Sequence, residues 1–278
     1  SNNVSIGYNA ATAMTVEDYN VAVGASALAG VTTDDIQGCV AIGAGALAAA
    51  HTQNGTVMLG GDAGALLTSG DHNIGIGYGA LKQHTTGSRN IAIGYGAMSL
   101  TAGDVNDAPA SVDNVFIGQM AGGGNWADDA DSNYNVGVGN YVMDSVLDGA
   151  IHNTAVGYSA LSSITDGSSG VTGGGAGYNN AFGSNALNAN LTGEGNVAMG
   201  AYAGSIQTVN KQCTWIGGAA GRYMKGDANT AVGNACMNGA GATGGNSGAN
   251  NTAVGYSAIF GATAALTGSD NVAVGVDA

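Results

Sequence analysis

The chain has 278 residues, with 5 basic and 19 acidic side chains and a formal net charge of −14. Nucleic acids and anionic membrane surfaces are bound through clusters of Lys and Arg, so this composition excludes both as partners. The 51 glycines argue against a helical protein, because glycine is a poor helix former. No apolar stretch is long enough to span a membrane, so direct membrane insertion is not expected.

A short phrase, Asn-x-Ala-Val/Ile-Gly-Tyr-x-Ala-Leu, returns about fifteen times along the chain and is clearest at residues 20–24, 90–98, 153–161 and 251–259. A glycine after an apolar pair sets the period, and its commonest spacing is 17 residues, as in Gly43, Gly60, Gly77 and Gly94. The triplet before each glycine is expected to form a short strand. In chain order these triplets are residues 4–6, 21–23, 40–42, 57–59, 74–76, 91–93, 115–117, 136–138, 154–156, 180–182, 197–199, 214–216, 230–232, 252–254 and 272–274.

This period is too short for helical repeats, which need more than about 30 residues. It predicts an all-β protein, a parallel β-solenoid of about fifteen coils that forms one elongated domain over residues 1–278. Each coil is expected to hold two short strands, the triplet and a second strand after the Ala-Leu segment. The recurring glycine is expected at the bend between them, where a positive φ or a missing Cβ is needed.

An asparagine stands four residues before the glycine in 12 of the 15 repeats, and Cys39, Thr56 and Cys213 are the exceptions. Stacked amides at equivalent positions predict a hydrogen-bonded ladder along the solenoid. The ladder residues chosen on this basis are Asn20, Asn73, Asn90, Asn114, Asn135, Asn153, Asn196, Asn229, Asn251 and Asn271.

The triplets indicate association with other copies. Side chains alternate in direction along a strand, and here the outer two positions are bulky while the middle one is most often Ala, sometimes Gly, Phe116 or Trp215. Both faces are therefore apolar, and a coil of this size buries only one of them. The other face is expected to pack against identical copies around a symmetry axis, most simply in a parallel homotrimer.

The Asn-x-Ala-Val/Ile-Gly-x-x-Ala repeat resembles the head repeat of trimeric autotransporter adhesins, which is also found in bacteriophage tail fibres. The resemblance covers nearly the whole chain. It implies a left-handed parallel β-roll, a tight trimer and no catalytic residues. Within residues 1–278 there is no neck, coiled-coil stalk or membrane anchor of the kind that follows the head in that family. The chain is therefore expected to be a fragment of a longer fibre or adhesin, or a unit that stacks end to end.

Four insertions interrupt the period, near residues 101–113, 123–134, 162–178 and 238–250. Loops of a solenoid often carry its binding surface. The second insertion places a tryptophan beside three aspartates, which is typical of a sugar platform but is expected more simply for a ring that folds back and covers the side of the roll. A further alternative is a Ca²⁺ site built from the acids. The candidate ligand-binding residues are Asn125, Trp126, Asp128, Asp129, Tyr134 and Tyr178.

Tyrosines follow the bend glycine in several repeats and are expected to pack at the coil edge, with a weak ligand stripe as the alternative. They are Tyr8, Tyr78, Tyr95, Tyr158 and Tyr256. The three cysteines are expected to be buried free thiols, with a thiol cluster across a symmetry axis as the alternative. No catalytic or metal-ligand spacing is found among the four histidines, so neither an enzyme nor a cofactor is expected.

These features predict a non-enzymatic, extracellular fibre or adhesin segment on a virion or a bacterial surface. Its expected partners are further copies of itself and a host-surface glycan or protein. The alternative is a structural subunit of a self-assembling extracellular filament, whose ends stack by β-augmentation.

Overall fold

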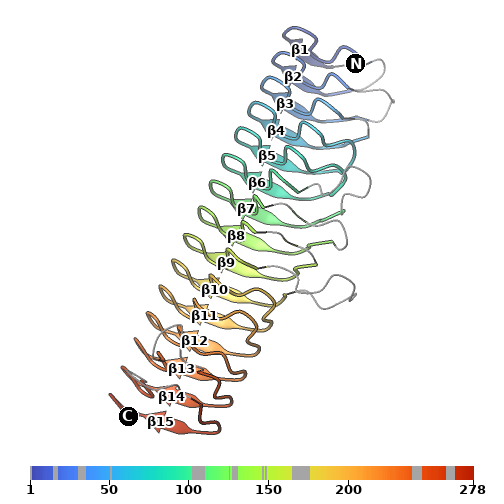
Figure 1. Ribbon diagram of the computed structural model, residues 1–278. Coiled ribbons are helices and arrows are strands. Elements are labelled where there is room, and N and C mark those ends of the chain that lie inside the picture. Colours follow the sequence, from blue (N-terminus) through green and yellow to red (C-terminus); the bar gives the residue numbers. More distant parts are fainter. Residues whose placement is uncertain are drawn as a thin grey trace. The chain divides into compact units, whose positions relative to one another are not determined.

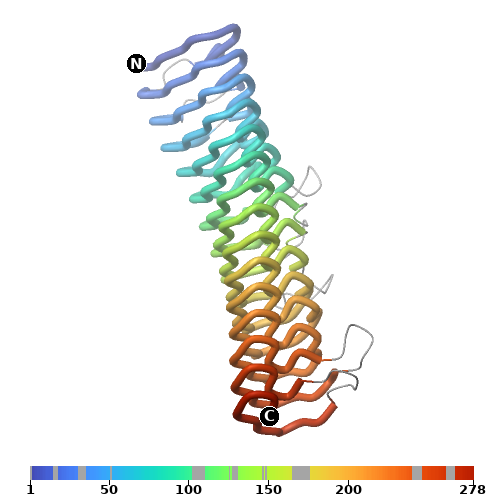
Figure 2. Tube along the Cα trace, turned by 90° about the vertical axis from the view of Figure 1, so that its left-hand side faces the viewer, coloured from blue at the N-terminus to red at the C-terminus, as the bar shows by residue number. Residues whose placement is uncertain are grey.

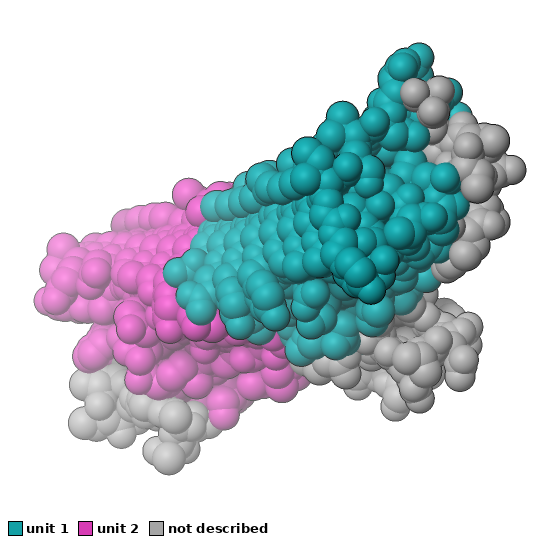
Figure 3. All heavy atoms as spheres, turned by 90° about the horizontal axis from the view of Figure 1, so that it is seen from above, with its two compact units in different colours: residues 1–140 teal, residues 141–278 magenta. Residues whose placement is uncertain are grey.

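A computed structural model describes residues 2–14, 18–30, 36–50, 52–101, 110–124, 126, 131–145, 147, 149–164, 176–239, 246–260 and 267–278. The chain divides into two compact units, residues 1–140 and residues 141–278, which are coloured separately in Figure 3. Among the described residues every regular element is a β-strand and none is a helix. The predicted all-β parallel solenoid is therefore confirmed.

In the first unit eight three-residue strands follow one another in chain order (Figure 1). Each pairs in parallel with the next, and equivalent repeat positions face each other, as Val21 faces Val40 and Val40 faces Val57. Consecutive coils of the solenoid are therefore stacked in exact repeat register. The strands are β1 (Val4–Ile6), β2 (Val21–Val23), β3 (Val40–Ile42), β4 (Val57–Leu59), β5 (Ile74–Ile76), β6 (Ile91–Ile93), β7 (Val115–Ile117) and β8 (Val136–Val138).

The second unit repeats this arrangement with seven strands, and the Cα trace in Figure 2 shows the successive coils. Its strands also pair in parallel and in repeat register, as Thr230 with Thr252. They are β9 (Thr154–Val156), β10 (Asn180–Phe182), β11 (Val197–Met199), β12 (Thr214–Ile216), β13 (Thr230–Val232), β14 (Thr252–Val254) and β15 (Val272–Val274).

The glycine after each strand forms the predicted bend. All fifteen of these glycines have φ between 129° and 144°, a region that is accessible to glycine and strained for other residues. Most of them also lie too close to the neighbouring coil for a side chain. A Cβ on Gly24 would stand 2.6 Å from the carbonyl oxygen of Gly43.

The expected second strand is not present among the described residues, where only three isolated bridges lie outside the named strands. The segment after the bend is instead a chain of turns. Its backbone groups bond to both neighbouring coils, since the N–H of Gly45 donates to Ala25 and the N–H of Leu47 donates to Ala63, each at 2.9 Å. Leu47 has φ +53°, which interrupts an extended strand while leaving the hydrogen bonds satisfied.

The core lies between the strand and these turns. The middle residue of strands β2 to β14 points inward and is buried, as are the alanine and the leucine or methionine three and four residues after the bend glycine. Where the inward strand residue is large, the position that usually carries leucine is a glycine. The three such pairs are Met58 with Gly64, Phe116 with Gly122 and Trp215 with Gly221.

Candidate functional site: the outer strand face and the tyrosine edge

The first unit exposes a column of bulky apolar side chains, which we call the outer column. Because the small middle residue faces the core, the two flanking residues of each strand face outward and are exposed or half-buried. Every member is Val, Ile or Leu. The members are Val4, Ile6, Val21, Val23, Val40, Ile42, Val57, Leu59, Ile74, Ile76, Ile91, Ile93, Val115, Ile117, Val136 and Val138.

The same face of the second unit is mixed. Its first outward position is Thr in four strands, Asn in one and Val in two, while its second outward position stays apolar. The threonines are Thr154, Thr214, Thr230 and Thr252. This unit therefore offers hydroxyl groups beside an apolar row, whereas the outer column of the first unit offers no polar side chain.

The asparagines before the strands form a buried ladder. The Oδ1 of Asn196 accepts the backbone N–H of Cys213 at 3.0 Å, and its Nδ2 donates to the carbonyl of Asn210 at 2.7 Å. Amide-to-amide bonds also occur, as from Asn114 to Asn90 at 3.1 Å. The ladder thus satisfies backbone groups on two neighbouring coils, and Asn179 belongs to it as well.

A second ladder, which the sequence analysis did not identify, lies two residues earlier in several repeats. Here a short polar side chain accepts the backbone N–H of the equivalent residue one coil earlier. Asp71 accepts from Asn54 at 2.8 Å, and Ser88 accepts from Asp71 at 3.0 Å. Asp227 does the same for Lys211 at 2.9 Å. The signal available in the sequence was the recurrence of Asp, Asn and Ser at this position.

The structure describes three of the six candidate ligand-binding residues, Trp126, Tyr134 and Tyr178. Trp126 is fully buried, its Nε1 donates to the carbonyl of Gly122 at 3.1 Å, and its ring meets Phe116 edge to face at 5.9 Å. It is therefore not an exposed platform, because burial of a large apolar ring against the core is more favourable than exposure. Asn125, Asp128 and Asp129 lie outside the described residues.

Tyr134 and Tyr178 are both exposed, at the position just before the ladder asparagine, but they belong to different units. Within the second unit the ring of Tyr178 stacks on His152 with centroids 5.1 Å apart. Among the described residues no group of three or more His, Cys, Asp or Glu side chains is placed to hold a metal ion.

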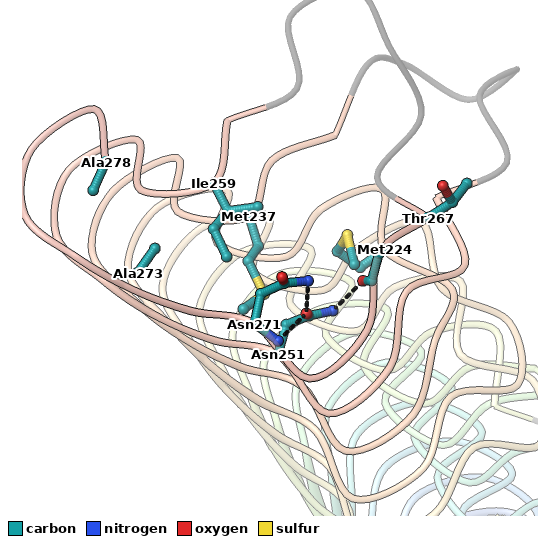
Figure 4. A pocket seen from close by; sticks show the side chains of 9 residues that line it. Met224, Met237, Asn251, Ile259, Thr267, Asn271, Ala273 and Ala278 are labelled. Atoms are coloured by element: carbon teal, nitrogen blue, oxygen red, sulfur yellow. Dashed lines mark hydrogen bonds between the residues drawn. The ribbon is translucent and has the colours of Figure 1, made fainter.

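The tyrosines after the bend glycine are exposed, and two of them are adjacent. Tyr78 and Tyr95 stack with centroids 5.8 Å apart and planes 14° from parallel. They border a surface cleft of about 320 Å³ in the first unit. Another cavity, of about 440 Å³, lies near the last coils of the second unit, where Met224, Met237 and the ladder residues Asn251 and Asn271 line it (Figure 4).

The buried titratable groups are neutral at ordinary pH. His84 is fully buried, with Nδ1 3.0 Å from Thr101 Oγ1 and Nε2 3.1 Å from the amide nitrogen of Asn90, and burial lowers its pKa to about 4. Cys39 and Cys213 occupy ladder positions as free thiols, and burial raises the pKa of each to about 11. Such thiols are poor nucleophiles.

The basic residues that form ion pairs join different coils. Lys82 pairs with Asp62 at 3.0 Å, Arg89 with Asp113 at 2.6 Å, and Lys211 with Glu194 at 3.1 Å. Arg222 lies over the rings of Tyr202 and Tyr223. Little positive charge is left to attract a polyanion.

Comparisons with protein-family models, curated proteins and solved structures gave no match. Within the part of the chain that the structure describes, no helix could cross a membrane.

Proposed function

We propose that the chain is a non-enzymatic segment of an extracellular fibre or adhesin, which works as a parallel homotrimer and attaches to a glycan or protein of a cell surface or matrix. The observation that carries the proposal is the outer column of the first unit, sixteen apolar side chains on one exposed face. Apolar patches of this extent mark interaction surfaces in soluble proteins.

Identical copies are the partners that fit this column best. A rotation axis along the direction in which the coils stack places each coil of one copy beside the same coil of the other copies. The outer columns of the copies then face one another coil by coil. Apolar surface removed from water stabilises an assembly by ~25 cal/mol per Å², and the column contributes part of the surface of each of its many half-buried or exposed Val and Ile side chains. The repeat's resemblance to adhesin heads supports three copies and a left-handed roll.

The proposed attachment role follows from the multivalency of a trimer. A trimer presents every exposed edge and loop in three copies, so contacts that are weak singly gain strength from their number. The proposed sites of display are a virion fibre or a bacterial cell surface.

The test is an array of immobilised glycans and matrix proteins probed with the wild-type chain and with the outer-column variant Ile76→Lys/Ile93→Lys. The proposal expects binding by the wild type and much weaker binding by a variant that has become monomeric. Leu66→Lys is the matched control, because Leu66 is an exposed apolar residue outside the strands. Binding to no surface, or equal binding by both variants, would contradict the proposed function.

A further inference from the structure

We infer that the cleft beside Tyr78 and Tyr95 in the first unit is a binding site for a neutral saccharide chain. This inference rests on the proposed attachment function and names the place and the chemistry of one contact. We call the site the tyrosine cleft. It is lined by Tyr78, Gly79, Lys82, Gln83, Tyr95, Gly96, Ser99, Leu100 and Met120.

The cleft exists because two features coincide in adjacent coils. Across the fifteen repeats, a tyrosine directly after the bend glycine is followed by another glycine only at Tyr78-Gly79 and Tyr95-Gly96. In the second unit the same tyrosine is followed by a serine, as in Tyr158-Ser159. A Cβ on Gly79 would meet only Lys82 Cδ, at 3.9 Å, so the missing side chain leaves open space beside the rings.

The rings of Tyr78 and Tyr95 are exposed rather than buried. Tyr78 is 55% exposed and Tyr95 is 58% exposed, so both rings are open to solvent at the border of the cleft. Their nearly parallel planes repeat from one coil to the next along the stack. Aromatic rings offer apolar surface together with a phenol hydroxyl, and this combination suits the apolar C–H faces and hydroxyl groups of a sugar.

The rim of the cleft supplies both hydrogen-bond donors and hydrogen-bond acceptors. Gln83 carries an amide and Ser99 a hydroxyl, and both groups donate and accept hydrogen bonds. Lys82 Nζ lies 3.0 Å from Asp62 Oδ2, with both side chains more than one-third exposed. Because these two charges neutralise each other in a chain of net charge −14, the cleft matches an uncharged ligand better than an anionic one. Its volume of about 320 Å³ lies at the lower end for ligand sites.

The test uses soluble, linear, neutral hexasaccharides of glucose, galactose, mannose and N-acetylglucosamine, titrated into the chain by calorimetry and by NMR of the tyrosine ring signals. We expect at least one of them to bind. Tyr78→Ala/Tyr95→Ala is expected to weaken that binding about tenfold or more. Gly79→Ser is expected to weaken it while preserving the fold, since Ser159 and Ser257 occupy the same repeat position with φ of 49° and 50°.

The matched control is Tyr158→Ala/Tyr256→Ala, which removes tyrosines at the same repeat position where no glycine opens a cleft. It is expected to leave binding unchanged. The inference is overturned if none of the sugars binds, if the control weakens binding as much as the cleft variants do, or if a proline-rich peptide binds the cleft in their place.

Failure of the cleft is distinguishable from failure of the proposed function. A trimer whose attachment to the array survives both cleft variants would refute the cleft and leave the attachment function standing. A monomer that still binds a hexasaccharide through Tyr78 and Tyr95 would refute the trimer and leave the cleft standing.

Discussion

Met58 occupies the space that a leucine fills in the preceding coil, and two glycines make this possible, Gly64 in its own coil and Gly75 in the next strand. A Cβ on Gly64 would lie 2.9 Å from Met58 Sδ. In the preceding coil the equivalent residues are Ala41 and Leu47, both fully buried. Both coils thus bury one large side chain. It comes from the strand in the coil of Met58 and from the turn segment in the coil of Leu47.

This relationship predicts strong coupling between positions 58 and 64. Met58→Ala alone should lower the free energy of unfolding by ~2–5 kcal/mol through a cavity, and Gly64→Leu alone should lower it by ~1–3 kcal/mol or more through overpacking. The double variant reproduces the Ala41/Leu47 arrangement and should recover most of both losses. Chemical denaturation of the four proteins measures the coupling, and additive losses would refute the account. Backbone strain does not confuse the comparison, because Leu47 has φ +53° and Gly64 has φ +59°.

The bend glycines should tolerate no side chain. Gly24→Ala combines an unfavourable φ of +133° with a Cβ 2.6 Å from the carbonyl of Gly43, so we expect unfolding at much lower denaturant concentration or failure to fold. The control is Gly38→Ala, since Gly38 has φ +65° and no atom near its Cβ position, while Tyr19 adopts φ +61° at the same repeat position. The control should cost only ~1 kcal/mol, and similar losses in both variants would contradict this explanation of the repeat.

The ladder should be essential wherever it serves backbone groups on two coils. Asn196→Ala would leave the N–H of Cys213 and the carbonyl of Asn210 without their present partner. Each buried unsatisfied group costs ~1–3 kcal/mol, so a loss of ~2–5 kcal/mol is expected. The converse change, Cys213→Asn, should be neutral or stabilising because it extends the ladder. Thermal unfolding monitored by circular dichroism decides between these outcomes, and a harmless Asn196→Ala would show that the ladder is dispensable.

His84 should make stability depend on pH. Its pKa is about 4 in the folded chain and about 6.5 in an unfolded one, so the unfolded chain binds more protons between these values. The free energy of unfolding therefore falls as the pH is lowered from about 6.5 to about 4, by ~3 kcal/mol in total. The contribution is fully present above pH ~6.5.

His84→Gln is expected to remove most of this pH dependence, because Gln207 occupies the same repeat position as a buried residue. The control is His72→Gln, which changes an exposed histidine and should leave the pH profile intact. Denaturation midpoints measured between pH 4 and pH 7 provide the comparison. An unchanged slope in His84→Gln would assign the acid sensitivity to other groups.

The sequence predicted the strand triplets, the bend glycines and the repeat register because each depends on a local rule that recurs at a fixed spacing. Gly43 and Gly60 could be identified as bends from spacing alone. The sequence did not determine which face of each triplet points inward, because Val40 and Ala41 are both apolar. The structure shows that Ala41 is buried and Val40 is only half-buried. The second strand, expected after the Ala-Leu segment, was wrongly predicted, since that segment pairs with its neighbours only through isolated bridges such as Thr52 with Ser69.

The candidate site was less predictable. Trp126 sits among polar residues in the sequence, yet its ring packs on Phe116, a contact set by an insertion whose path the repeat does not encode. The tyrosine cleft is lined by Gly79 and Gly96. Their role becomes apparent only when the two adjacent coils that carry them are compared. In the sequence they look like two more glycines in a glycine-rich chain.

The most direct test of the account is the mass of the wild-type chain in solution by light scattering, measured over a range of concentrations. The account predicts a constant mass of about 80 kDa, three times the chain mass of 26.8 kDa, because the outer column is covered by identical copies. A mass near 26.8 kDa would show that the column stays exposed. A mass that grows with concentration into open fibres would also contradict the account and would favour a filament subunit.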